Sequence, residues 1–333
     1  MKGNLLGYKV VFLAVLVLGL EVLSSSVGAG AGTLSVCPTG CQFSKIQDAI
    51  NTAQPGDTIE IKAGTYEENL TINSSLTLVG EDRDKVTLKG AQEGKGGITI
   101  SGGDGVEVTL SGITIAETKL ASPKNFLEDG LRVLRSAKLT LSKARLSKNG
   151  DSGLELRDRA QAIITDSEFI GNGNNGIGLF DSAQVTISRS KIAQNGSGLA
   201  QNFNNGLSAV GRNKLTLQES EISGNTNEGI FLAEETTAQI VKNQVLSNKM
   251  NGVVLLDSAT VELKENRIQD NTFWGVTEVL IQCSFGDDSF SGQVTGEKNE
   301  ILGNGKGLTE QQKQSGDGAG NVCPKELEKL KKS

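Results

Sequence analysis

Hydrophobic and polar residues alternate within short segments throughout the second half of the chain. In one representative unit the apolar positions form three groups: Ile177 and Leu179, Val185 and Ile187, and Ile192. Alternation over so few residues is typical of a β-strand with one buried face. The pattern therefore predicts three short strands in this unit, joined by tight turns.

The unit repeats every 23 residues, and two residue types mark each return. A glycine followed by Leu, Ile or Val recurs at intervals of 23, 23, 30, 23, 23 and 23 residues, at Gly130, Gly153, Gly176, Gly206, Gly229, Gly252 and Gly275. Asparagine keeps the same spacing until a longer last interval, at Asn149, Asn172, Asn195, Asn225, Asn248, Asn271 and Asn304. A fixed period of about 20 to 50 residues indicates a repeat architecture. Because each strand would meet its equivalent after one turn of the chain, we predict an all-β solenoid, a parallel β-helix whose asparagines hydrogen-bond from coil to coil.

The ends of the chain depart from the repeat. Four segments are expected in this order: a signal peptide over 1–29, an N-terminal segment with a capping helix over 30–57, the parallel β-helix over 58–305, and a C-terminal cap or tail over 306–333. The capping helix is amphipathic over 44–53, and a capping box of Ser44 and Gln47 would begin it. A short charged helix over 324–332 would cover the other end.

Charge and cysteine content narrow the partners. The net charge of −6 disfavours nucleic acid and anionic membranes, and no stable membrane insertion is expected once the signal is removed. Four cysteines in an exported chain favour disulfides, and three pairings are possible. Proximity along the coils favours Cys37 with Cys41 and Cys283 with Cys323. Because the chain has no histidine, neither a metal site nor a cofactor is expected.

Helix, turn and strand motifs follow one another in a specific order near the N-terminus. They are Phe43-Ser-Lys-Ile-Gln-Asp-Ala-Ile, Pro55-Gly-Asp-Thr-Ile-Glu-Ile, Gly64-Thr-Tyr-Glu-Glu and Leu76-Thr-Leu-Val-Gly. These stretches resemble the N-terminal cap and first coils of the pectin lyase-like superfamily, and the resemblance extends over 43–305. It implies a single-stranded right-handed parallel β-helix. The superfamily includes polysaccharide lyases, hydrolases and esterases, phage tailspikes, and many proteins with no established activity.

The catalytic motifs of the enzymatic branches do not transfer to this chain. Without histidine, the Gly-His-Gly signature of polygalacturonases is missing, and no Arg-Ile-Lys element follows. The clustered aspartates and arginine base of pectate lyases have no matching arrangement. The sequence therefore favours a non-catalytic or uncharacterised branch.

Interruptions of the repeat at about 117–129, 196–202 and 283–292 border one predicted sheet. In the superfamily this sheet typically forms the floor of a glycan-binding groove. Aromatic rings stack on sugars and arginines bind carboxylates, so the expected ligand-binding residues are Arg132, Arg157, Phe180, Phe231 and Trp274. The alternative is that the interruptions fold over the strip and bury it, and that Trp274 shields the end of the core.

Acidic residues lie along the edge of the same groove. Asp129 and Asp151 occupy comparable positions on adjacent coils, where a separation of about 5 Å is possible, and Glu228 lies further along. Paired carboxylates are what glycoside hydrolysis needs, although acidic residues at such turns also serve as solvated turn formers.

The prediction is a secreted or envelope-associated protein that binds a polysaccharide or another surface molecule without catalysis. The alternatives are a polysaccharide hydrolase or lyase acting through the acidic edge, and a spacer or self-associating wall component.

Overall fold

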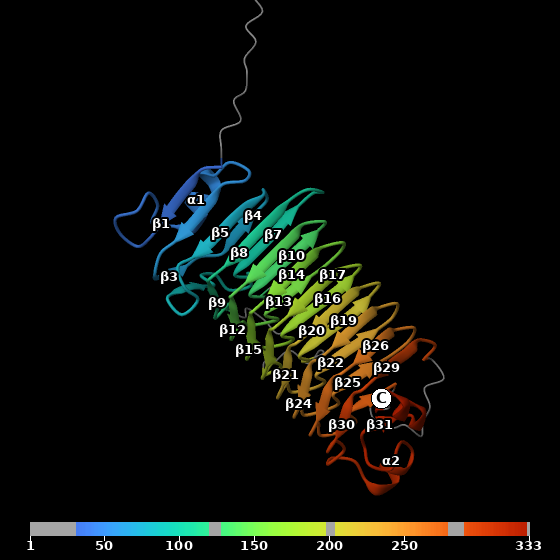
Figure 1. Ribbon diagram of the computed structural model, residues 1–333. Helices are drawn as coiled ribbons and strands as arrows, with labels where there is room; N and C mark the ends of the chain where they lie inside the picture. The colour runs from blue at the N-terminus through green and yellow to red at the C-terminus, as the bar shows by residue number, and fades with distance from the viewer. Residues whose placement is uncertain (1–30, 120–127, 198–203, 279–289, 332–333) are drawn as a thin grey trace, which may run out of the picture. The chain divides into compact units, whose positions relative to one another are not determined.

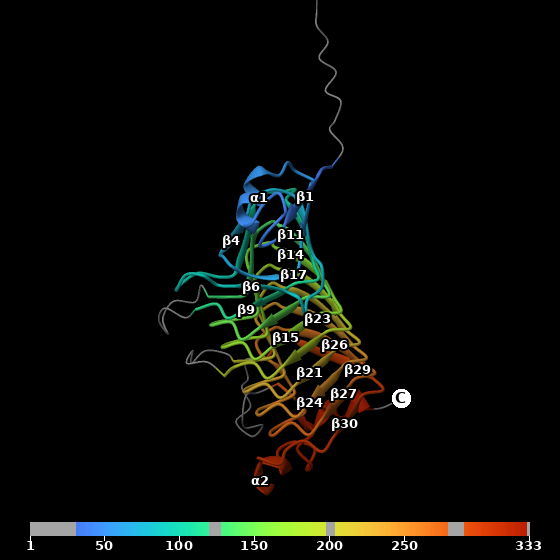
Figure 2. The ribbon, with the colours of Figure 1, turned by 90° about the vertical axis from the view of Figure 1, so that its left-hand side faces the viewer.

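The computed structural model describes residues 31–119, 128–197, 204–278 and 290–331. They belong to one compact unit in which three parallel sheets run along a stack of coils (Figure 1). The three sheets are named A, B and C, and their strands are given below. Each complete coil contributes one strand to each sheet, and the chain passes through the sheets in the order C, A, B. Figure 2 shows the same stack from a side on which the short strands of sheet B are in view.

The strands have the following bounds in spatial order. Sheet A contains β1 (Thr33–Val36), β2 (Thr58–Ile61), β5 (Leu76–Gly80), β8 (Glu107–Ser111), β11 (Lys138–Ser142), β14 (Gln161–Thr165), β17 (Gln184–Ser188), β20 (Lys214–Gln218), β23 (Thr237–Val241), β26 (Thr260–Lys264) and β29 (Gln293–Glu297). Sheet B contains β3 (Gly64–Glu67), β6 (Val86–Lys89), β9 (Thr114–Ala116), β12 (Arg145–Ser147), β15 (Glu168–Ile170), β18 (Lys191–Ala193), β21 (Glu221–Ser223), β24 (Gln244–Leu246), β27 (Arg267–Gln269) and β30 (Glu300–Leu302). Sheet C contains β4 (Leu70–Ile72), β7 (Ile98–Gly102), β10 (Leu131–Arg135), β13 (Leu154–Leu156), β16 (Ile177–Asp181), β19 (Leu207–Gly211), β22 (Ile230–Ala233), β25 (Val253–Leu255), β28 (Val276–Thr277) and β31 (Val322–Cys323).

The predicted all-β solenoid and its parallel pairing are confirmed. Leu154 pairs with Ile177 one repeat later, and Ile177 pairs with Leu207 across the longer interval. Inward residues from all three sheets form one continuous, largely aliphatic core. Since every coil covers the edge of its neighbour, strand edges remain only at the two ends of the stack.

The predicted asparagine ladder is also confirmed. Asn149 Nδ2 donates to Asn172 Oδ1 at 2.9 Å, and equivalent bonds continue from coil to coil as far as Asn304. A Cβ atom at Gly130 would lie only 2.5 Å from Asn149 Nδ2, so the repeating glycine keeps the space that the ladder occupies.

A second ladder, which the sequence analysis did not find, lies at the turns between sheets A and B. There each side chain accepts a hydrogen bond from the backbone N–H of the preceding coil, through Ser167, Ser190, Ser220, Asn243, Asn266 and Asn299. Three serines are followed by three asparagines in this role, and the change of residue type hides the period. Both ladders satisfy backbone groups that the buried turns would otherwise leave unpaired.

The N-terminal helix α1 (Ile46–Thr52) covers the first coils, but the predicted capping box is wrong. No side chain of the preceding residues caps the helix. Instead, the Glu68 carboxylate accepts hydrogen bonds from the backbone N–H groups of Ile46 and Gln47, at 2.8 and 3.0 Å. A carboxylate from a later coil therefore replaces the local cap, which a local motif cannot reveal.

At the other end lie α2 (Glu310–Gln314) and the 3₁₀-helix η2 (Lys325–Lys331), which buries Leu327 and Leu330 against the core. The predicted Cys37–Cys41 disulfide is present. Cys323 is also disulfide-bonded, while its expected partner Cys283 and the expected signal peptide lie outside the described residues. Among the helices of the described part, none has the length and apolar character needed to cross a membrane.

Candidate functional site

Sheet C carries the residues that the sequence analysis proposed for ligand binding. Its strands align one outward row in register, from Arg132 through Glu155, Gly178 and Ser208 to Phe231. The row is not evenly accessible: Arg132 is partly buried, whereas Glu155, Ser208 and Phe231 are buried. The interruptions at 117–129, 196–202 and 283–292 fall largely outside the described residues.

Two arginines and two carboxylates form a charged network at the start of this row. Arg132 Nε lies 3.1 Å from Asp129 Oδ2, and Arg132 Nη2 lies 2.9 Å from Glu155 Oε1. Arg157 Nε donates to the same Glu155 oxygen at 2.7 Å, and its Nη2 donates to Oε2 at 3.1 Å. Glu155 therefore holds both guanidinium groups in place. Glu155 is not among the residues that the sequence analysis proposed for ligand binding.

Arg157 and Phe180 lie at an open groove beside this network. Arg157 is 39% exposed, and its Cζ atom lies 4.4 Å from the centroid of the Phe180 ring. The groove has a volume of about 370 Å³ and is also lined by Asp181, Val210 and Arg212. One ring face thus contacts a cation, in a mixed apolar and charged cleft of the kind that fits sugars.

The other aromatic candidates are buried. Phe231 is 8% exposed, packs with Ala233 and Val254, and does not line the groove. Trp274 is completely buried and packs with Leu308 and Cys323 toward the C-terminal end of the stack. Trp274 therefore matches the alternative in which it shields the end of the core.

The acidic candidates do not form one cluster. Asp129 and Asp151 are close, but one residue out of phase: Asp129 lies opposite Ser152, whose N–H donates to its Oδ1 at 3.2 Å. Asp151 lies opposite Glu128, whose carbonyl accepts its N–H at 3.2 Å. The predicted equivalence of Asp129 and Asp151 is therefore corrected to a diagonal relation. Glu228 lies three coils beyond Asp151, which is roughly 14 Å along the stack.

Burial perturbs all three acidic candidates. Asp129 is fully buried, and burial followed by the charges of Glu155 and Asp151 raises its pKa well above the usual value. Burial also raises the pKa of Asp151 to about 6, although a hydrogen bond with Asn174 opposes the shift. The pKa of Glu228 is raised by burial, against a hydrogen bond from Asn251. A carboxyl group that holds its proton near neutral pH can serve as a general acid.

Several buried polar atoms near this network have no hydrogen-bond partner. They are Asp151 Oδ1, Asn175 Nδ2, Asn204 Oδ1 and Ser208 Oγ, on three successive coils. Gly178 lies between Glu155 and Ser208, and its lack of a side chain makes room for the Phe180 ring: a Cβ would be 3.0 Å from Phe180 Cε2 and 3.7 Å from Asn175 Nδ2. Of these residues the sequence analysis proposed only Asp151, and the unmet hydrogen bonds of all four follow only from the fold.

The carboxylates of the network do not make a metal centre. Within the described ranges, no group of three or more Asp, Glu, Cys or His side chains is arranged to hold a metal ion. The arrangement has charged, aromatic and hydrogen-bonding groups of the kinds that bind a sugar.

Comparison with known proteins supports the fold. A family model described as "Right handed beta helix region" matches residues 40–205 and 129–292. No curated protein matches the chain significantly.

Two solved structures have similar folds. An alginate lyase from Paenibacillus sp. str. FPU-7 has a TM-score of 0.56 and 16% identity, covering 88% of this chain and 97% of that one. The Dettilon tailspike protein has a TM-score of 0.51 and 14% identity, covering 83% of this chain and 63% of that one. At these identities the similarity establishes the architecture of the chain.

Proposed function

This chain belongs to the right-handed β-helix family, and on that premise we propose that it is an exported protein that binds a polysaccharide in the groove beside sheet C. The observation that carries the proposal is the Arg157–Phe180 pair, which is accessible in the groove and anchored from behind by Glu155. The free face of Phe180 would stack on a sugar ring, and Arg157 would bind its hydroxyl or carboxylate groups. The similar architecture of an enzyme named as an alginate lyase is consistent with a polysaccharide ligand.

Export is part of the same proposal. The Cys37–Cys41 disulfide supports an oxidising compartment, since such bonds are rare in reducing cytosol. Expression of the full chain, followed by fractionation and a free-thiol assay, tests this point. Recovery of the folded protein only in the cytosol with reduced cysteines would contradict it.

Binding is tested by titrating the protein with alginate and polygalacturonate, two carboxylated polysaccharides, and with neutral glucans. We expect Phe180→Ala and Arg157→Ala each to weaken binding to a carboxylated polymer roughly tenfold. Arg189→Ala is the matched control, because Arg189 is exposed and ion-paired with Asp166 on another face. Unchanged binding by Phe180→Ala, or no binding to any polymer by the unaltered protein, would refute the groove as the site.

The raised pKa values of Asp129 and Asp151 favour a second candidate, cleavage of a polysaccharide by acid and base groups at this edge. In that case the unaltered protein releases reducing ends or unsaturated products from one of the same polymers. Asp129→Asn and Asp151→Asn would abolish the release while Glu228→Gln, three coils away from Asp151, would not. Product release that persists in both aspartate variants would exclude these residues.

A further inference from the structure

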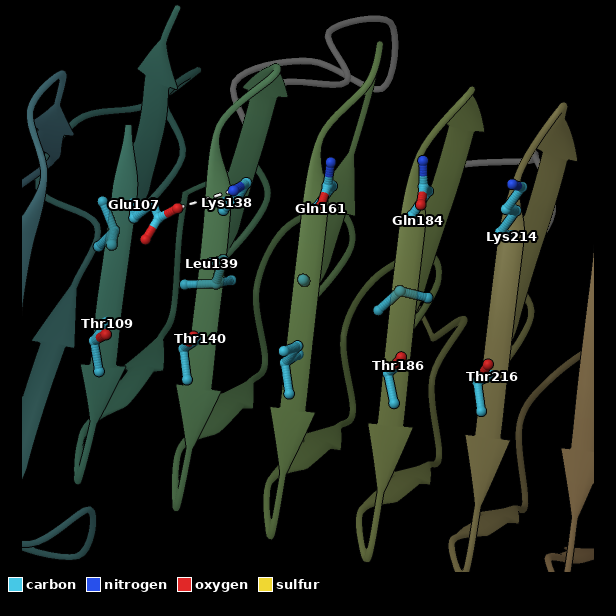
Figure 3. A pocket seen from close by; sticks show the side chains of 14 residues that line it. Glu107, Thr109, Lys138, Leu139, Thr140, Gln161, Gln184, Thr186, Lys214 and Thr216 are labelled. Carbon is cyan, nitrogen blue, oxygen red and sulfur yellow. Dashed lines mark hydrogen bonds and ion pairs between the residues drawn. The ribbon is translucent and has the colours of Figure 1, made fainter. Parts of the chain in front are cut away.

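A second groove lies on a different sheet, on the outer face of sheet A. It has a volume of about 560 Å³ and crosses five adjacent strands, β8, β11, β14, β17 and β20 (Figure 3). The floor is a regular β-surface, so its side chains repeat at the coil spacing of about 4.8 Å. The groove shares no lining residue with the one that contains Arg157 and Phe180.

Hydroxyl groups form a row along this groove. In Figure 3, Thr109, Thr140, Thr186 and Thr216 occupy equivalent positions on their strands, and strand register places Ile163 between Thr140 and Thr186. A second row on the same strands has Ser111, Ser142, Thr165 and Ser188 in register, but these residues do not line the groove and Ser188 is buried. Hydroxyl groups both donate and accept hydrogen bonds.

The middle of the groove is uncharged. Lys138 is neutralised at one end by Glu107, 2.9 Å away, and the next two strands have Gln161 and Gln184 in that row. Within the described residues, no ion pair joins strand positions of β14, β17 and β20. The face of sheet B differs, because Arg145–Glu168 and Lys191–Glu221 pairs tie neighbouring coils there.

Ile163 is 55% exposed in the middle of this polar row. Threonine is favoured on any exposed strand, so β-propensity alone can account for the threonines. It does not account for a concave floor with an exposed aliphatic side chain at its centre. An apolar centre between hydroxyl and amide groups matches the surface of a sugar ring, whose C–H groups are framed by hydroxyls.

We propose that the groove on sheet A binds an uncharged polysaccharide chain lying parallel to the stack of coils. Five coils span roughly 19 Å, and the rise from one coil to the next is about the length of one sugar unit in an extended polysaccharide chain. Successive units would therefore meet equivalent threonine and glutamine side chains. Among the described residues that line the groove, Lys138 is paired with Glu107 and Lys214 is the one further cation, so charge complementarity favours a neutral chain.

The two proposed sites differ in their expected response to salt. Binding at Arg157 involves a charged group and weakens with salt, whereas binding over Thr140, Ile163 and Thr186 does not. A protein with both sites could hold two chemically different polymers at once. Each proposal can fail without the other.

The test uses co-sedimentation of the full chain with insoluble cellulose, chitin and granular starch, at about 0.1 M and about 1 M salt. We expect retention on at least one polymer at both salt concentrations. Ile163→Lys and Thr186→Lys, which place a long charged side chain in the groove, should lower the retained fraction roughly tenfold. Arg189→Ala, whose side chain lines neither of the two grooves, should leave retention unchanged.

Gln239→Lys is the matched control. Gln239 is exposed and belongs to the same row as Thr216, one coil further along, but it does not line the groove. Retention of Ile163→Lys equal to that of the unaltered protein would overturn the proposal, as would no retention on any of the three polymers. A concentration-dependent dimer that Ile163→Lys abolishes, measured by sedimentation velocity without polysaccharide, would instead assign the face to a second copy of the chain.

Discussion

The guanidinium of Arg157 lies over the ring of Phe180, 4.4 Å from its centroid, and the two residues occupy the same position on adjacent coils. Arg157 is also bound to both oxygens of Glu155, so one side chain links the buried charged network to the open groove. This relationship makes the geometry of the groove depend on the charges behind it.

Arg157→Ala should destabilise the protein by about 2–3 kcal/mol, because it leaves the buried Glu155 carboxylate with one guanidinium partner fewer. Phe180→Leu should cost less, about 1 kcal/mol, since the ring is partly exposed and the lost cation–π contact is small. Urea unfolding of both variants and of the double variant measures the coupling between the two residues. If the effects of the two single variants on the free energy of unfolding simply add in the double variant, the contact between Arg157 and Phe180 contributes no stability.

Asn195→Ala should destabilise the stack by about 2–4 kcal/mol. Asn195 donates to Phe169 O and to Asn225 Oδ1, and its Oδ1 accepts two hydrogen bonds from Asn172, all in buried surroundings. Gln194→Ala, at the exposed preceding position, is the control and should change stability by less than about 0.5 kcal/mol. A similar unfolding midpoint for both variants would show that the ladder is dispensable at this coil.

Stability should fall as pH rises from about 4 to about 6. The pKa of Asp151 is raised to about 6 in the folded protein, so the folded state holds a proton that the unfolded chain releases near its ordinary value of about 3.9. The resulting penalty is complete above pH 6 and amounts to about 3 kcal/mol. Asp129 acts in the same direction.

Asp151→Asn should therefore stabilise the protein at pH 7 and have little effect at pH 4. Urea midpoints at several pH values between these limits measure the difference between the variant and the unaltered protein. Parallel pH profiles for the two proteins would be incompatible with a raised pKa at Asp151.

Gly316→Ala should loosen the C-terminal end of the stack. A Cβ there would lie 2.7 Å from two atoms of the Trp274 ring and 2.4 Å from the carbonyl oxygen of Val322, which costs about 1–3 kcal/mol to relieve. Because Trp274 is the only tryptophan, its fluorescence reports this end specifically. Gly103→Ala is the control, since a Cβ at Gly103 meets no atom within 4 Å. An unfolding midpoint, followed by Trp274 fluorescence, that shifts equally in both variants would contradict this account.

The repeat could be read from the sequence because it is a local pattern used many times. Alternation over a few residues determines which side chains point inward, and a constant period brings equivalent strands together, as with Leu154 and Ile177. Asn172 could be assigned to a ladder for the same reason. Such predictions need no knowledge of distant contacts.

Other features depend on contacts between distant segments. Glu68 caps α1 from a later coil, and Phe231 is buried although its strand position faces outward. The one-residue offset between Asp129 and Asp151 is different, because the 23-residue period in the sequence already pairs Asp129 with Ser152.

The sequence by itself determined the coil, its period and the inward face of each strand, because these follow from the chain's own alternation. Only the tertiary structure decided which outward side chains are accessible: it placed Arg157 and Phe180 at a groove and enclosed Trp274 in packed side chains. Accessibility depends on what covers a residue, and the covering groups come from other coils and from the ends of the chain. Alternation within one strand carries no information about them.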